Sequence, residues 1–128
     1  MSKKLNKSKL VYDGKVFKIE FFVTESGKVP AEEWLESLTE KQQAKFVALF
    51  MRFGDLGKIW NERKFKHLSG TDQIFEFKVD SGRVLSFFFY GKRLVLTHGF
   101  SKKSAKTPKK EIEMAEKFKQ EFEKRDQK

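Results

Sequence analysis

The residues of this sequence with the most chemical potential are basic, and their spacing brings several of them together. A run of lysines follows Phe100 with no acidic residue before Glu111, and it comprises Lys102, Lys103, Lys106, Lys109 and Lys110. Lysine side chains hold anionic oxygens through charge-assisted hydrogen bonds. The run leads into a predicted helix, whose first free N–H groups also favour anions. These residues therefore predict a site for an anion.

Four residues that precede this lysine run in the sequence offer other chemistry. His98 can move a proton with little tuning, because an unperturbed imidazole has a pKa of about 6.5. Arg83 keeps its proton, so it can only hold an anion or pair with an acid. Lys78 can act as a base only where its pKa falls far below about 10.4. Glu76 is either a base or a partner for Lys78, and we favour the partner.

Other reaction classes find little support in the sequence. There is no cysteine, which excludes disulfides and thiolate sites. No glycine-rich phosphate loop, serine triad or metal-ligating cluster occurs, so we expect neither a cofactor nor a metal. No apolar run approaches the about 18 residues of a membrane span, and the first residues lack the apolar core of a secretory signal. We therefore expect a cytoplasmic protein with no membrane partner.

The charge of the chain indicates a polyanionic partner. The formal net charge is +10, yet residues 29–57 carry more acidic than basic groups, so the excess lies on either side of them. Such an excess favours nucleic acid, although a solubilising surface remains the alternative. The 15 Phe and 2 Trp argue for a folded core, and 128 residues fit a single domain.

Helix and strand patterns must position these groups. Val16–Thr24 is typical of a strand, which Asp13-Gly14 would pair with Leu10–Tyr12. Pro30 would open a short helix that buries Trp34, Leu35 and Leu38, and a capping box at Thr39–Gln42 would begin a second helix, ending at Gly54 or Gly57. Three strands would follow at Phe75–Asp80, Arg83–Tyr90 and Arg93–Phe100. Thr107 would cap a last helix with Pro108 as its first residue.

The expected fold is α+β, an antiparallel sheet with two N-terminal helices and a C-terminal helix in the order β-α-α-β-β-β-α. Residues 1–15 would form a basic lead-in that can take part in a hairpin. Residues 16–125 would form the domain itself.

Loop lengths would then set the register of the three strands. Two-residue loops at Ser81-Gly82 and Gly91-Lys92 would place Lys78 opposite Leu85 and Tyr90 opposite Arg93. Opposed residues project on the same side, so one face would carry Lys78, Arg83, His98 and Phe100. The far end of that face would need cover from the last helix, because it would hold Phe87, Phe89, Leu94 and Leu96.

Three segments carry a family resemblance. Residues 97–108 read Thr-His-Gly-Phe-Ser-Lys-Lys-Ser-Ala-Lys-Thr-Pro and precede Glu111-Ile112. Upstream lie Gly27–Pro30 with Trp34-Leu35, and Phe75–Lys78 followed by Arg83–Leu85. In this order and spacing, over roughly residues 16–122, they resemble phage-derived, HigB-like members of the RelE toxin superfamily. Lys78 stands where these relatives usually carry arginine, and Glu76 where some RelE-type toxins carry lysine.

The resemblance implies the toxin of a type II toxin–antitoxin pair, a metal-independent endoribonuclease that cleaves messenger RNA on the ribosome and so inhibits translation. An RNA 2′-hydroxyl would attack its adjacent phosphate. The antitoxin would be a small helix-turn-helix protein. The catalytic groups would be Lys78, Arg83, His98, Lys102 and Lys103. Further RNA contacts would come from Lys64, Lys66, Phe100 and Lys106.

Several roles stay open at this level. His98 is a proton carrier or a histidine packed under the last helix, and Phe100 stacks on a base or belongs to the core. Arg83 clamps phosphate or pairs with Asp80, and His67 belongs to a basic rim. The main alternative function is a non-catalytic RNA-binding module on the same fold, as in a decayed toxin. A phage structural or adaptor protein would not need the basic face.

Overall fold

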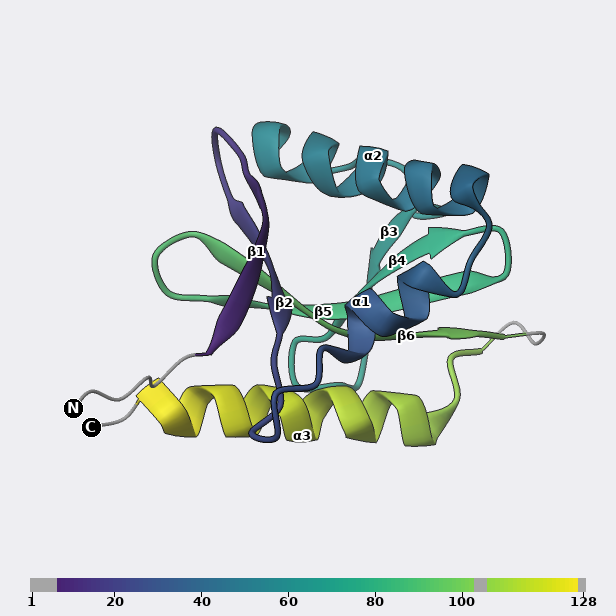
Figure 1. The fold of residues 1–128 in the computed structure, drawn as a ribbon. Helices are drawn as coiled ribbons and strands as arrows, with labels where there is room; N and C mark the ends of the chain where they lie inside the picture. The colour runs from purple at the N-terminus through teal and green to yellow at the C-terminus, as the bar shows by residue number, and fades with distance from the viewer. Residues whose placement is uncertain (1–6, 103–105, 127–128) are drawn as a thin grey trace.

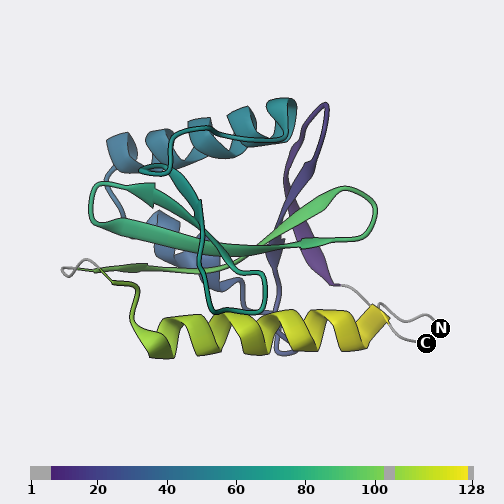
Figure 2. The same cartoon turned by 180° about the vertical axis from the view of Figure 1, so that it is seen from behind.

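A six-stranded sheet lies between helices in the computed structural model, which describes residues 7–102 and 106–126 (Figure 1). The strands lie in the order β1-β2-β6-β5-β4-β3. Two helices cover one face and the third covers the other (Figure 2). The elements are β1 Ser8–Asp13, β2 Lys18–Phe22, α1 Pro30–Glu36, α2 Glu40–Leu56, β3 Phe65–His67, β4 Phe75–Val79, β5 Gly82–Phe89, β6 Arg93–Ser101 and α3 Lys109–Asp126.

The predicted ends of the first two helices are confirmed. Pro30 is the first residue of α1. At α2 the Thr39 side chain accepts a hydrogen bond from the backbone N–H of Gln42, and the Gln42 side chain accepts one from the Thr39 backbone. Gly57 ends α2 in the left-handed region, with a φ of 79° that favours glycine. These local signals therefore fix where both helices lie in the chain.

The α+β class is confirmed, but the predicted element order and the wholly antiparallel sheet are wrong. β1 and β2 form the hairpin that Asp13-Gly14 suggested, and β2 also pairs with β6 in a parallel arrangement. This pairing is possible because a long connection containing both helices separates the two strands. The sequence does not predict the short edge strand β3, because the basic residues of its segment indicate only a rim. The order in the described residues is β-β-α-α-β-β-β-β-α.

The predicted register is right at one end of β5 and β6 and wrong elsewhere. The first hairpin loop is Asp80-Ser81, so Lys78 lies opposite Arg83 and not opposite Leu85. The second loop holds one residue more than predicted, and Phe89 lies opposite Arg93. A bulge at Thr97 then cancels that error. His98 consequently lies opposite Leu85, and Phe100 lies opposite Arg83, as predicted.

The bulge also decides which side chains face each helix layer. Phe87 and Phe89 pack toward α3, as predicted, but Leu94 and Leu96 do not. Both leucines join the core beneath α1 and α2, because the extra residue at Thr97 reverses the alternation of β6 before that point. The Thr97 hydroxyl donates to the backbone oxygen of Leu85.

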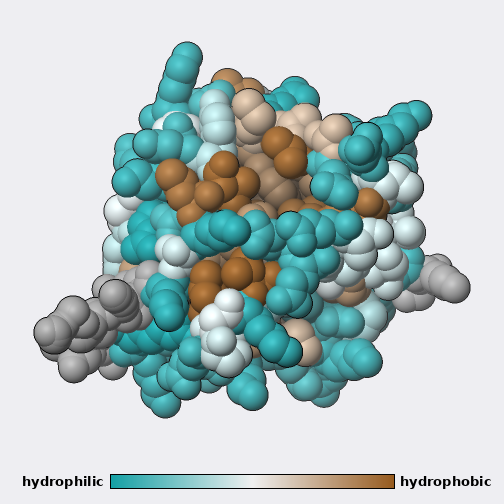
Figure 3. Space-filling view, viewed as in Figure 1, coloured by the Kyte–Doolittle hydropathy of each residue, from teal (hydrophilic) through white to brown (hydrophobic). Residues whose placement is uncertain are grey.

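The sheet and the first helix meet closely at β6. A Cβ added at Gly99 would lie 2.2 Å from the ring of Trp34, so this position of the strand admits only glycine without displacing α1. Behind it, α2 contributes Phe46, Phe50 and Phe53 to the larger core. Figure 3 shows hydrophobic residues gathered in the middle of one face of the molecule, within a mostly hydrophilic surround. No helix in the described parts of the chain is long and apolar enough to cross a membrane.

Candidate functional site

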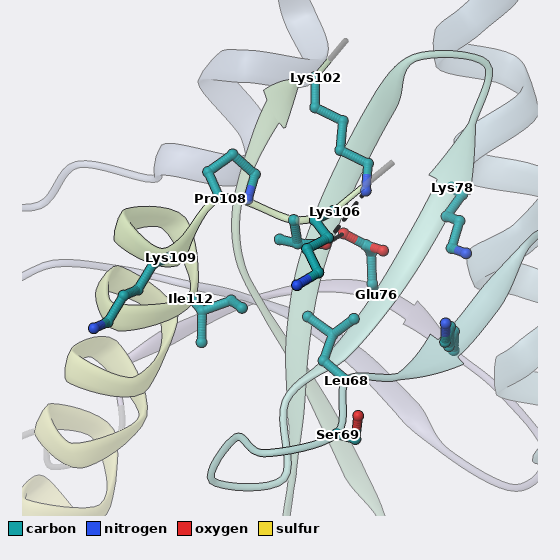
Figure 4. A pocket seen from close by; sticks show the side chains of 11 residues that line it. Leu68, Ser69, Glu76, Lys78, Lys102, Lys106, Pro108, Lys109 and Ile112 are labelled. Atoms are coloured by element: carbon teal, nitrogen blue, oxygen red, sulfur yellow. Dashed lines mark hydrogen bonds between the residues drawn. The ribbon is translucent and has the colours of Figure 1, made fainter. Parts of the chain in front are cut away.

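A cleft lies where the beginning of α3 meets strands β3 and β4 (Figure 4). Its volume is about 710 Å³. Leu68 and Ile112 form part of an apolar wall. The cations that line it are Lys66, Lys78, Lys102, Lys106 and Lys109. The β3–β4 pairing places Lys66 near Lys78, and the β4–β5 and β5–β6 pairings bring the segment after β6 to the same end of the sheet. Lysines from three separate parts of the chain therefore make the cleft strongly basic.

The carboxylate of Glu76 lies at the bottom of this cleft and is almost completely buried, with 1% of the residue exposed. The hydroxyl of Thr107 donates to its Oε2 over 2.6 Å. Lys102 Nζ lies 3.5 Å from the same Thr107 hydroxyl. Figure 4 shows the Lys102 side chain pointing toward Glu76. A buried carboxylate requires hydrogen-bonding partners or neighbouring cations. Thr107 therefore ties the segment before α3 to β4, the strand next to the edge of the sheet.

Two lysines of the cleft have a lowered pKa. Burial is the largest cause for both Lys78 and Lys102. The positive charges of Lys66 and Arg83 lower the pKa of each further, while the Glu76 carboxylate opposes the shift. A lowered pKa increases the fraction of neutral amine, which can accept a proton. The cleft thus combines anion binding with groups that can transfer protons.

Arg83 lies beside the cleft and is held at the β4–β5 turn. Its Nη1 donates to the backbone oxygens of Asp80 and Gly82 over 2.7 and 2.8 Å. Within the described residues its buried Nε has no hydrogen-bond partner. The alternative to phosphate binding was an ion pair with the Asp80 carboxylate, whereas the bond that Arg83 makes to Asp80 is to its backbone oxygen. The guanidinium lies near enough to affect Lys78 and Lys102, so it adds positive charge to the same region.

His98 lies beneath α3 and does not line the cleft. It is 5% exposed, and its Nε2 lies 3.0 Å from a carboxylate oxygen of Glu111. Its Nδ1 lies 3.1 Å from the Thr97 hydroxyl. Burial lowers the pKa of His98 more than Glu111 raises it, which favours a neutral ring near neutral pH. The arrangement corresponds to the alternative of a histidine packed under the last helix.

The remaining residues predicted to contact RNA or take part in catalysis lie in different places. Lys66 and Lys106 line the cleft, whereas Lys64 lines a neighbouring groove. Phe100 is 8% exposed and packs with the α3 core, so its ring offers little surface to a base. Lys103 lies outside the described residues. The structure therefore gathers the lysines but separates them from His98 and Phe100.

Thr107 is the cleft residue that sequence patterns misassigned. It was expected to cap α3, with Pro108 as the first helical residue. In the structure the Pro108 carbonyl accepts the first bonds of the helix, from the backbone N–H groups of Glu111 and Ile112. α3 accordingly begins at Lys109, which leaves the Thr107 hydroxyl available for Glu76. A Thr-Pro pair predicts a helix start, but nothing in the sequence names a partner 31 residues away.

The side chains of the cleft have the chemistry to hold a phosphodiester and to move protons beside it. No group of three or more histidine and acidic side chains among the described residues is placed to hold a metal ion. The lysines can hold a phosphate and stabilise the charge that develops on it. The amines with lowered pKa, and the carboxylate, supply groups for proton transfer.

Comparison with protein families gives a match over most of the chain. The family model described as "Phage derived protein Gp49-like (DUF891)" matches residues 33–120, more than two thirds of the chain. The matched segment runs from α1 into α3 and contains every residue that lines the cleft. A search of curated proteins found no match.

Proposed function

We propose, because the chain belongs to the family of phage-derived Gp49-like proteins, that it is the toxin of a type II toxin–antitoxin pair. Gp49-like proteins are a toxin-like family of such systems. The proposed activity of this chain is endonucleolytic cleavage of messenger RNA on the ribosome. The observation that carries this proposal is the basic cleft, in which Lys78 and Lys102 with lowered pKa values surround the buried Glu76 carboxylate.

The reaction transfers a phosphoryl group within the RNA, from the 5′-oxygen of the next nucleotide to the 2′-oxygen. The 2′-oxygen bonds to the adjacent phosphorus, the bond from phosphorus to the next nucleotide's 5′-oxygen breaks, and a 2′,3′-cyclic phosphate forms. The 2′-hydroxyl gives up a proton and the leaving 5′-oxygen takes one. Lys66, Lys106 and Arg83 hold the phosphate and offset its charge. Lys103 belongs to the same proposed set by its place in the sequence.

Proton transfer falls to the lysines with lowered pKa. One of Lys78 and Lys102 accepts the 2′-proton as a neutral amine, and the other, protonated, donates to the leaving oxygen. Glu76 holds these cations in place through its charge and keeps Thr107 beside Lys102. His98 acts as a positioning residue, since its ring is bonded to Glu111 in the first turn of α3.

The cleft is suited to an RNA substrate whose geometry is set by the ribosome. The 2′-hydroxyl must lie in line with the leaving oxygen, and such positioning supplies several kcal/mol of the barrier. Lysines are flexible point charges that hold a phosphate without fixing its orientation. Ribosome-bound message supplies that geometry, so free RNA is cut slowly.

Single-turnover cleavage of one message tests the proposal, with the message free in solution and then programmed into ribosomes. We expect cleavage on the ribosome to be faster by at least about a hundredfold. Comparable rates in the two states would indicate a free-standing ribonuclease.

A non-catalytic RNA-binding module is the second candidate. Neither of the chain's two histidines lines the cleft, and the Glu76 carboxylate already accepts a hydrogen bond from Thr107. Such a module would bind ribosomes and arrest translation while the message remains intact.

The proposed partner is an antitoxin that occludes the cleft. An acidic segment laid across Lys78, Arg83 and Lys102 would complement their charge.

A further inference from the structure

A second basic groove adjoins the cleft. It lies between α2 and the β3–β4 end of the sheet and has a volume of about 550 Å³. Its cations are Lys45, Arg52, Arg63, Lys64 and Lys78. Asp80 is the acidic residue that lines it, and this carboxylate lies 3.9 Å from Lys45 in an exposed ion pair. The charge of this groove, called here the α2 groove, is therefore positive.

The cleft and the α2 groove are continuous at β3 and β4. Lys78 lines both of them. On β3 and just before it, Lys66 lines the cleft and Lys64 lines the α2 groove. Lys64 belongs to the turn that precedes β3, where its backbone N–H donates to the Asn61 oxygen. This turn places Lys64 in the α2 groove while Lys66 lies in the cleft, so the two basic surfaces adjoin each other at the edge of the sheet.

We infer that the α2 groove binds the single-stranded RNA that continues from the cleft, holding neighbouring phosphates through Arg52, Arg63 and Lys64. This inference rests on the proposed function and adds the path of the substrate. It also gives α2 a role in binding that the net acidic charge of residues 29–57 conceals, because Lys45 and Arg52 project toward the groove. Arg63 and Arg52 are exposed, so their side chains are accessible to the strand.

Binding of 2′-O-methyl RNA tests this path without cleavage. The probes are a three-nucleotide and a nine-nucleotide single strand, and the protein is compared with the Arg52→Gln/Arg63→Gln variant. We expect the variant to bind the longer strand about tenfold more weakly and to lose about 1.4 from its salt slope, the value for two phosphate contacts on a single strand. Its affinity for the short strand should stay unchanged, because that strand fits within the cleft.

A matched control removes two charges elsewhere. Lys117→Gln/Lys124→Gln changes exposed lysines of α3 that line neither the cleft nor the α2 groove, and it should bind the longer strand as the unchanged protein does. Equal affinity of the groove variant and the unchanged protein for the longer strand would overturn the inference. So would an equal loss of affinity for single-stranded and double-stranded RNA, which would mark an unspecific anion surface.

Cleavage of ribosome-programmed message by the unchanged protein separates this inference from the proposed function. Groove-dependent binding without any cleavage would refute the endonuclease and leave the RNA path standing. Cleavage on ribosomes with no effect of the groove substitutions on binding would leave the endonuclease standing and refute the path.

Discussion

Thr107 and Glu76 are joined by a hydrogen bond of 2.6 Å that links the segment before α3 to β4. This bond places Lys106 and Lys109, which flank that segment, along the same cleft as Lys78. The geometry of the cleft therefore depends on a contact between two residues far apart in the sequence.

Removing that hydroxyl should open the cleft. We expect Thr107→Val to lower the free energy of unfolding by about 1–2 kcal/mol, because a buried carboxylate loses a donor, and to slow ribosome-dependent cleavage. Urea unfolding and single-turnover cleavage measure the two effects. Thr107→Ser keeps the hydroxyl and should behave as the unchanged protein in both. Equal activity of the Val and Ser variants would exclude a role for this bond in the reaction.

Lys102 should weaken the fold while it serves the reaction. Its pKa is lowered, so in the alkaline range below the ordinary value of 10.5 the unfolded chain binds more protons than the folded one. Stability should therefore rise with pH in that range. Lys102→Met should raise the urea midpoint at neutral pH and flatten this rise, while slowing cleavage about a hundredfold.

Lys102→Arg gives the matched comparison. It retains the charge but cannot release its proton at any working pH, so ribosome binding should persist while cleavage falls if Lys102 is the base. A lower urea midpoint for Lys102→Met would show that the charge stabilises the fold.

Arg83→Ala should abolish toxicity without unfolding the protein. Growth arrest on expression in bacteria should be relieved, because the guanidinium is expected to hold the phosphate. The two bonds to the Asp80 and Gly82 carbonyls also disappear, so a loss of about 1–2 kcal/mol in stability is expected. Circular dichroism establishes that the variant is folded. A folded Arg83→Ala protein that remains fully toxic would remove Arg83 from the mechanism.

His98 should affect stability more than chemistry. Its pKa in the folded protein is lowered, so the unfolded chain takes up a proton first as the pH falls through about 6.5. The stabilisation present above that pH should be lost below it, and His98→Gln should make the urea midpoint depend less on pH. Cleavage by the variant at neutral pH should stay within about tenfold of normal. Loss of a general acid or base would cost more, because general acid–base catalysis contributes about 10²–10⁴-fold. A larger loss in a folded variant would place the imidazole in the reaction.

The antitoxin should contact the cleft directly. Hydrogen exchange of the complex should show protection across β4 and the start of α3, and Lys78→Glu should weaken binding by reversing the local charge. Lys117→Glu on the exposed part of α3 serves as the control. Protection confined to α1 and α2 with an accessible cleft would show that neutralisation blocks ribosome approach instead.

Local signals in the sequence predicted much of the fold. Pro30, the Thr39–Gln42 box and Gly57 fixed helix ends because capping involves residues within one turn. Strand alternation placed Lys78, Arg83 and Phe100 on one face correctly. The β2–β6 pairing escaped prediction because it depends on residues some 75 positions apart, for which alternation gives no partner.

The site was harder to predict than the face that carries it. The longer loop shifts the β5–β6 pairing by one residue, and the bulge at Thr97 shifts it back near His98. Residue patterns indicate neither feature. Facing the right side did not expose His98 or Phe100, because the length of α3 covers both. The burial of Glu76 was also not predicted, because its hydrogen-bond partner Thr107 lies 31 residues away in the sequence.

The parallel pairing of β2 with β6 governs how the domain forms as the chain is synthesised. β1 and β2 can pair as soon as both exist, but the other edge of β2 has no partner until Arg93–Ser101 has been made. β2 carries the large apolar residues Phe21 and Phe22 on its two faces, and an apolar strand with an unpaired edge invites pairing with other chains. β6 is the last strand, and Thr107 follows it. A nascent chain therefore completes the pairing of β2, and brings Thr107 to Glu76, only after β6 and the segment that follows it have been made.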